Sequence, residues 1–170
     1  GRPANDENYT RIDKIDPATT WQHAPGNSSN HLDYGHTPEF PFGYGLSYSS
    51  FKYSDLKLDR HELTVGETLN ISIVIENTGQ VEATEIVQLY VRDLVGDITR
   101  PIKELKAYER VSLPPGKKRT IQFELNTNLL SFHNQTLNNI VEPGQFNVWV
   151  SKHSQDEENE SWFKIVKKQP

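Results

Sequence analysis

The chain has 170 residues, of which 34% are hydrophobic and 24% charged, with a formal net charge of −5 and no cysteine. This length suits one ordinary domain plus an extension, because a seven-stranded sandwich takes roughly 100 residues. The acidic balance argues against nucleic acid as a partner, since phosphate binding needs clustered Lys and Arg. No apolar run approaches the roughly 20 residues of a membrane span, and without cysteine there is no disulfide framework.

Residues 1–40 show little apolar periodicity and are rich in Asn, Asp, His, Pro and Gly. A segment of this length without regular elements is uncommon inside a compact domain. We expect an irregular leader that is either flexible or packed on polypeptide absent from this chain. The chain also has no methionine, so we expect a fragment or a processed product, with any signal peptide lying upstream.

From Phe51 onward, apolar and polar residues alternate in one short segment after another. Alternation with a period of two is typical of a strand with one buried face. The predicted strands are Phe51–Leu58, Thr68–Asn77, Thr84–Asp93, Leu105–Leu113, Arg119–Leu125, Gln145–Ser151 and Ser161–Val166. The predicted core consists of their inward residues, Ile71, Ile73, Ile75, Val87, Leu89, Val91, Ile121, Phe123, Phe146, Val148 and Phe163.

Turn residues separate these strands. Asn77-Thr78-Gly79, Pro114-Pro115-Gly116 and Glu142-Pro143-Gly144 each fall between two predicted strands. Proline presets one turn position, and Gly or Asn tolerates the positive φ of another. Many short strands with such turns, and no helical periodicity over ten or more residues, predict an all-β sandwich.

Residues 40–51, Phe-Pro-Phe-Gly-Tyr-Gly-Leu-Ser-Tyr-Ser-Ser-Phe, interleave aromatic residues with two glycines. Glycine lets the backbone turn sharply and approach its neighbours, and aromatic side chains bury large areas against a second surface. Left exposed, such a cluster would favour aggregation. The composition therefore indicates a junction between two packed bodies.

This segment resembles the one that leads into the C-terminal fibronectin type III-like domain of glycoside hydrolase family 3 enzymes. Further matches follow in order along the chain: the strand-ending turn at Asn77, the stretch from Arg100 to Tyr108, Leu130-Ser131-Phe132 and the two Pro-Gly turns. Gly1-Arg2-Pro3 resembles the end of the preceding domain in that family. The stretch from Asp16 to Pro38 departs from the family pattern, so nothing is carried across it.

The resemblance implies an all-β, immunoglobulin/fibronectin type III-like antiparallel β-sandwich over residues 51–170, with a long irregular N-terminal leader. Residues 1–50 would be leader and junction, forming the tail of an upstream α/β sandwich domain. The family enzyme also has a barrel domain with a nucleophilic Asp, and retaining hydrolysis of β-linked glucosides uses two carboxyl groups roughly 5 Å apart. Both catalytic groups would lie upstream, so this chain is expected to hold no catalytic residue.

The expected function is therefore a non-catalytic structural domain that stabilises the catalytic domains of a β-glucosidase, secreted or periplasmic. Its partners would be the upstream barrel and α/β domains, with homodimer contacts as a further option. Arg2 matches a family residue near the rim of the active site, which implies a substrate contact, while an ion pair at the domain junction is the structural alternative. No cofactor and no metal are expected: His31, Asp33 and His36 fall in a polar loop without the support that ligands need.

The alternative is an autonomous carbohydrate-binding module. By alternation, Trp149 and Tyr90 point to the polar faces of their strands, where exposed rings would stack on sugars; packing on the missing domains or under a loop is the competing interpretation. An unrelated adhesion sandwich is a third hypothesis, because this fold serves many functions. Carboxylate pairs such as Glu62 with Glu67, or Asp93 with Asp97, are interpreted as solvated surface.

Overall fold

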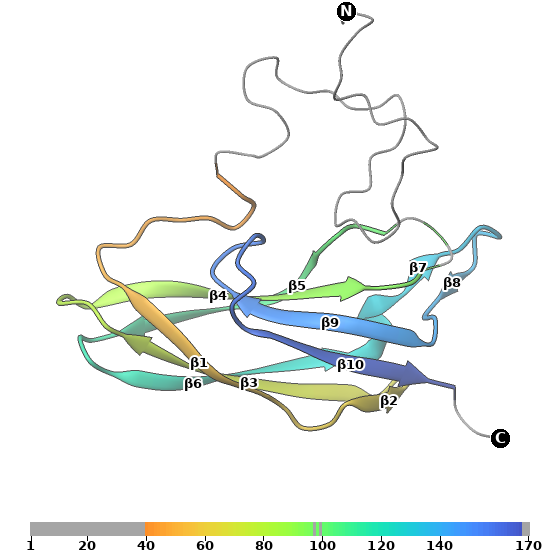
Figure 1. The fold of residues 1–170 in the computed structure, drawn as a ribbon, viewed down its shortest axis with the longest axis horizontal. Helices are drawn as coiled ribbons and strands as arrows, with labels where there is room; N and C mark the ends of the chain where they lie inside the picture. Colours follow the sequence, from red (N-terminus) through yellow and green to blue (C-terminus); the bar gives the residue numbers. More distant parts are fainter. Residues whose placement is uncertain (1–39, 97, 99, 168–170) are drawn as a thin grey trace, which may run out of the picture. The chain divides into compact units, whose positions relative to one another are not determined.

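The computed structural model describes residues 40–167 except 97 and 99. Its strands form two layered sheets, which Figure 1 shows edge-on. The three-stranded sheet has the order β1 (Phe51–Leu58), β3 (Thr68–Asn77), β6 (Lys118–Asn126). The five-stranded sheet has the order β2 (Glu62–Thr64), β10 (Glu160–Val166), β9 (Gly144–Ser151), β4 (Ala83–Asp93), β5 (Glu104–Leu113). A 3₁₀ turn, Thr127–Leu130, leads to a small hairpin of β7 (Phe132–His133) and β8 (Asn139–Ile140).

The all-β sandwich and all seven predicted strands are confirmed, and no helix in the described part is long and apolar enough to cross a bilayer. The short strands β2, β7 and β8 were not predicted, because two or three residues are too few to display an alternation. Strand β2 also pairs with β10 in parallel, whereas every other pair is antiparallel.

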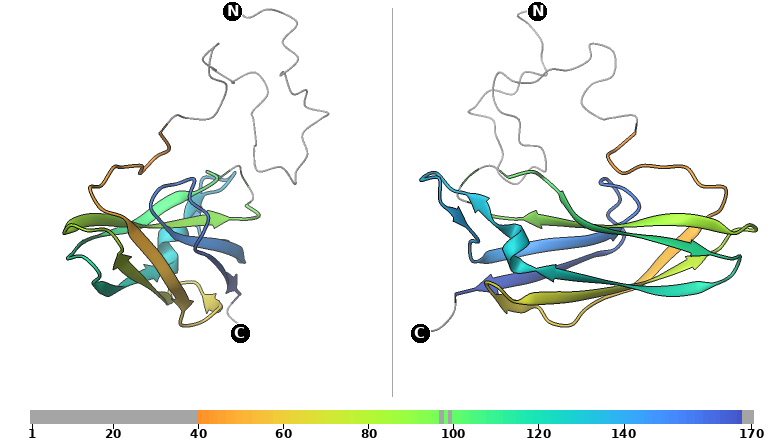
Figure 2. Two further views of the ribbon diagram at one scale, coloured as in Figure 1. Left: turned by 60° about the vertical axis from the view of Figure 1, so that its left-hand side comes forward. Right: turned by 180° about the vertical axis from the view of Figure 1, so that it is seen from behind.

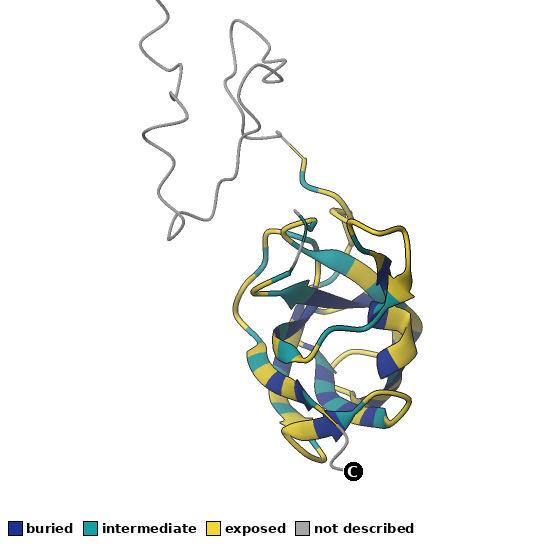
Figure 3. Cartoon of the chain, turned by 90° about the vertical axis from the view of Figure 1, so that its right-hand side faces the viewer, coloured by how far each residue is buried: buried dark blue, intermediate teal, exposed yellow. Residues whose placement is uncertain are grey.

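The core lies between the two sheets, where the inward residues of each strand meet. All eleven predicted core residues are buried, and Figure 3 shows buried and exposed positions alternating along the strands. Ile71 faces Phe123 and Ile73 faces Ile121 across β3 and β6. In the other sheet, the rings of Phe146 and Phe163 stack with centroids 5.3 Å apart. Burial of these side chains is the main stabilising term of the sandwich.

The junction segment, defined here as Phe40–Ser50, and the loop after β9 lie side by side next to the five-stranded sheet (Figure 2). The backbone N–H of Ser154 in that loop donates to the carbonyl of Phe42 at 2.9 Å. The assignment of residues 1–50 to an upstream α/β domain stays a prediction, since residues 1–39 lie outside the described ones.

Candidate docking surface

The junction segment is attached to the outer face of the five-stranded sheet through its backbone. The side-chain amide of Gln88 donates to the carbonyl of Gly43 at 3.0 Å, and the hydroxyl of Tyr90 lies 3.4 Å from the carbonyl of Phe42. Gln88 and Tyr90 belong to β4, point away from the core, and also bond to each other at 2.6 Å. Both are buried, so these hydrogen bonds satisfy polar atoms that the junction segment removes from water.

Gly43 allows this close approach. Its φ is +81°, and a Cβ placed there would lie 2.1 Å from Oε1 of Gln88 and 2.6 Å from the hydroxyl oxygen of Tyr90. Any side chain at this position would clash with the buried pair and would also favour a different backbone conformation. Glycine is therefore required at position 43 by both space and conformation.

A second attachment holds the other end of the junction segment. The hydroxyl of Ser49 donates to Oδ1 of Asn77 at 2.6 Å, and the N–H of Thr78 donates to the carbonyl of Ser50 at 2.8 Å. Asn77 is fully buried, and its Nδ2 donates to the carbonyls of Val81 and Leu113. Asn77 and Thr78 thus tie the β3–β4 turn, the end of β5 and the junction segment together at one end of the sandwich.

Between the two attachments, the side chains of the junction segment project outward. Phe42 is 67% exposed, Leu46 89% and Tyr48 100%. We call the exposed apolar side chains of this region the aromatic strip: Phe40, Phe42, Tyr44, Leu46 and Tyr48 of the junction segment, with Ile86, Leu105 and Tyr108 of β4 and β5. Exposed apolar side chains gathered in one region are typical of an interaction site.

The aromatic strip borders a groove of about 670 Å³. Glu85, Gln88, Lys152 and His153 supply its polar lining. Glu85 accepts a hydrogen bond of 2.8 Å from the hydroxyl of Tyr53. Burial raises the pKa of Glu85, and the effect is only partly offset by that hydrogen bond and by the charge of Lys152. The groove therefore combines apolar walls with one partly desolvated carboxyl group.

The prediction that Trp149 presents an exposed ring is wrong. Trp149 is 3% exposed and Tyr90 1%, although both point away from the core as alternation requires. The ammonium group of Lys103 lies 4.2 Å from the ring centre of Trp149, and the hydroxyl of Tyr90 lies 3.4 Å from the carbonyl of Phe42 in the junction segment. Packing beneath a loop, the competing interpretation, describes Trp149, and its ring is not open to a sugar.

The charged side chains in the stretch from Arg100 to Tyr108 make contacts within the domain. The guanidinium of Arg100 lies 4.3 Å from the ring centre of Phe132 and pairs with Glu104 at 3.0 Å. Lys106 also pairs with Glu104, at 2.6 Å. Although burial raises the pKa of Glu104, the hydrogen bonds from these two cations lower it overall. Burial lowers the pKa of Lys103 beside Trp149. These charges hold the 100–108 stretch in place.

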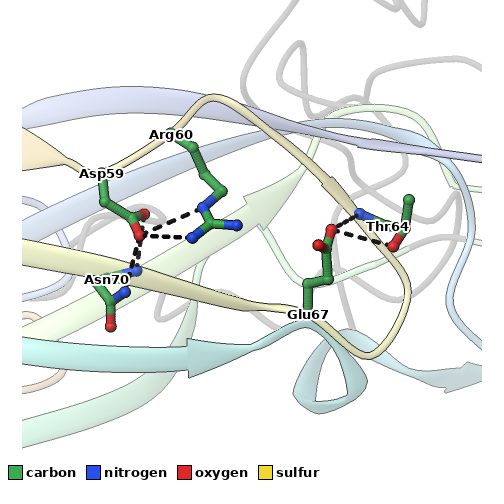
Figure 4. Close-up of polar contacts among 5 residues, drawn as sticks. All are labelled: Asp59, Arg60, Thr64, Glu67 and Asn70. Atoms are coloured by element: carbon green, nitrogen blue, oxygen red, sulfur yellow. Dashed lines mark hydrogen bonds and ion pairs between the residues drawn. The ribbon is translucent and has the colours of Figure 1, made fainter.

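Other polar clusters stabilise turns. Figure 4 shows Glu67 accepting hydrogen bonds from the N–H and hydroxyl of Thr64. Glu62 and Glu67 are both exposed, as their interpretation as solvated surface requires. In the same view the carboxylate of Asp59 accepts hydrogen bonds from the side chains of Arg60 and Asn70. Among the described residues no group of three or more His, Cys, Asp or Glu is arranged to hold a metal ion.

Several of the sequence-predicted residues lie outside the described residues. These are Arg2, the loop residues His31, Asp33 and His36, and Asp97. The residues that the sequence did not single out are Gln88 and Glu85; Asn77 was singled out only as a turn residue. Gln88 had a faint signal, since it lies on the predicted polar face of its strand; nothing in the sequence indicated that this face is covered.

Comparisons with known proteins agree with this architecture. Residues 85–154 match the family model of the fibronectin type III-like domain. The chain is 41% identical over 119 residues to a putative β-xylosidase of Formosa agariphila and 39% identical over 123 residues to thermostable β-glucosidase B of Acetivibrio thermocellus; these matches cover 70% and 72% of this chain and 16% of each relative. A β-glucosidase from Listeria innocua, solved in complex with isofagomine, superimposes with a TM-score of 0.71 at 38% identity, over 83% of this chain and 19% of that one.

Fold and sequence thus define a fibronectin type III-like sandwich domain. The relatives that share it are several times longer, because this chain spans only about a sixth of their length. The chain belongs to the fibronectin type III-like domains of glycoside hydrolase family 3 enzymes, the family of those β-xylosidases and β-glucosidases.

Proposed function

We propose that this chain is the non-catalytic C-terminal domain of a retaining β-glucosidase-type glycoside hydrolase, and that it stabilises the catalytic domains by docking onto them through the aromatic strip. The observation that carries the proposal is the orientation of the junction segment. Its backbone is bonded to the sandwich at Gly43 and Ser50, while Phe42, Leu46 and Tyr48 point away from it. Apolar side chains held in this way are available to a partner surface.

The upstream domains are the partner that best accounts for this strip. The relatives are about six times as long as the matched region, since it covers 16% of each, and they are named as β-glucosidases and β-xylosidases. One of them is a periplasmic β-glucosidase of Salmonella typhimurium, which supports a periplasmic or secreted location. Interfaces between domains of one chain are large enough to use such a strip.

The test uses the enzyme that contains this chain, with an aryl β-glucoside as substrate. We expect the double variant Leu46→Ala/Tyr48→Ala to inactivate faster on heating, with KM nearly unchanged, because truncation weakens docking and leaves the reacting groups intact. Val65→Ala/Leu137→Ala, which removes two exposed side chains elsewhere, is the control. Equal inactivation rates for both double variants would contradict docking through the strip.

The isolated 170-residue chain provides the complementary test. We expect it to leave the aryl glucoside intact, because both catalytic carboxyl groups would lie upstream. Hydrolysis by the purified chain that a single substitution within it abolishes would overturn the proposal.

A further inference from the structure

We propose that the groove beside the aromatic strip binds a basic side chain, an arginine or lysine of the catalytic domains, which pairs with Glu85. This inference rests on the proposed docking function and specifies the chemistry of the partner. Glu85 lines the groove, and its carboxyl accepts a hydrogen bond from Tyr53. Within the described residues, no basic group lies within ion-pair distance of Glu85.

The state of this carboxylate favours a cationic ligand. A partly buried carboxylate without a close counter-ion is unfavourable, and a cation with hydrogen-bond donors relieves that cost most directly. Lys152 is exposed and lies over the ring of Tyr53, with its ammonium 5.5 Å from the ring centre. It lines the groove and its charge acts on Glu85, but it forms no ion pair with that carboxyl. The other acceptor sites of the carboxyl remain for an incoming donor.

The walls of the groove suit the rest of such a side chain. Leu46, Ile86 and Leu105 supply apolar surface, and the rings of Tyr44 and Tyr108 are partly exposed. The aliphatic stem of Lys or Arg packs on apolar surface while its charged end reaches a polar group. Aromatic rings additionally attract cations at their faces. A groove with apolar walls and one carboxylate matches this combination.

Charge across the interface then gives docking its specificity. The apolar strip can pack on many surfaces, whereas an unpaired Glu85 would be penalised against any surface that lacks a donor at this point. The correct domain is thus distinguished by one basic residue in register with the groove.

The experiment compares Glu85→Gln in two contexts. Glutamine keeps an acceptor for the Tyr53 hydroxyl and removes the charge. In the isolated chain we expect Glu85→Gln to leave the urea midpoint unchanged or raise it, because it removes a partly desolvated charge. In the whole enzyme we expect it to increase the rate of thermal inactivation roughly tenfold at low salt, since breaking one side of a buried pair is strongly unfavourable, and less at high salt.

Glu109→Gln is the matched control, because Glu109 is exposed on β5 and should change neither measurement. If Glu85→Gln had the same effect on stability in the isolated chain and in the whole enzyme, this inference would be wrong. If Leu46→Ala/Tyr48→Ala still accelerated inactivation, the docking function would stand. If neither Glu85→Gln nor the double variant altered the enzyme, both would be wrong. Binding of millimolar glucose to the isolated chain that Glu85→Gln abolishes would assign the groove to sugars instead.

Discussion

At the scale of single residues, Gly43 is the position where a minimal change should matter most. We expect Gly43→Ala to lower the free energy of unfolding by about 2 kcal/mol, because the added methyl group clashes with Gln88 and Tyr90 and a left-handed φ is unfavourable for alanine. Urea unfolding of the chain measures this difference.

Gly45→Ala is the natural comparison in the same segment. A Cβ at position 45 would have no atom within 4 Å, so we expect a change below about 0.5 kcal/mol. Equal effects of the two substitutions would mean that the backbone of the junction segment is not held against β4 at Gly43.

Asn77 connects more structure than any other polar residue at its end of the sandwich. Asn77→Ala would leave the carbonyls of Val81 and Leu113, the hydroxyl of Ser49 and the N–H of Gly79 without this partner. We expect a loss of about 3 kcal/mol, since buried polar groups left unpaired are costly, and urea unfolding is again the measurement. Asn138→Ala, on the exposed hairpin between β7 and β8, should change stability by less than about 0.5 kcal/mol.

At the scale of elements, β9 and β10 are joined by the stacked rings of Phe146 and Phe163. We expect Phe163→Ala to destabilise the chain by about 4 kcal/mol, because it removes a fully buried ring and leaves a cavity between the sheets. Trp162→Ala changes the neighbouring residue on the outer face, where the ring is 47% exposed. Chemical denaturation should show the larger loss for Phe163→Ala; the reverse order would place Trp162 in the core.

Elements with a long alternation were predictable from sequence, and short or covered ones were not. Strands such as β3 and β6 alternate over nine or ten residues, and one side of each faces the core. Leu63 has only two neighbouring residues within β2. Its burial depends on the pairing of β2 with β10, so no alternation in the local sequence indicates it. Alternation also assigned Trp149 to the correct face of β9, but it carries no information about the Lys103 side chain that covers that face.

The docking surface was only partly predictable from the sequence. The composition of residues 40–51 indicated a junction; in the structure Phe40, Phe42, Tyr44 and Tyr48 are exposed, whereas Phe51 is buried in the core. The groove was not predictable, because it combines the junction segment with Glu85 of β4 and Tyr108 of β5. The pairing of β4 with β5 and the hydrogen bond between Gln88 and Gly43, 45 residues apart, decide which side chains share that surface, and a local pattern does not specify them.

At the scale of the whole molecule, the pH dependence of stability should be clearest on the alkaline side. In acid, carboxyl groups act in opposite directions: burial raises the pKa of Glu85 and Asp93, whereas hydrogen bonds lower that of Glu104 despite its burial. The first two favour the folded state as pH falls, and Glu104 disfavours it, so their contributions partly cancel.

In alkali, Lys103 opposes two buried tyrosines: burial lowers the pKa of Lys103, which favours the folded state as pH rises. Burial, together with the neighbouring charge of Glu85, raises the pKa of Tyr53 far above its ordinary value of 10.0, and burial raises that of Tyr90 in the same direction. Above pH 10 the unfolded chain therefore releases the Tyr53 proton while the folded chain retains it. The stability associated with the protonated hydroxyl is complete below pH 10 and is lost as pH rises, at about 1.4 kcal/mol per pH unit for each such group.

Tyr53→Phe isolates this contribution. At pH 7 we expect the variant to lose about 1 kcal/mol with its hydrogen bond to Glu85. Between pH 10 and 11.5, its free energy of unfolding should fall less steeply than that of the wild type, because one proton-releasing group is gone while Tyr90 and Lys103 contribute as before. Urea unfolding at several pH values measures both slopes. Equal slopes for the variant and the wild type would show that the hydroxyl of Tyr53 ionises as readily in the folded chain as in the unfolded one. That result would contradict the burial of this hydroxyl beside Glu85.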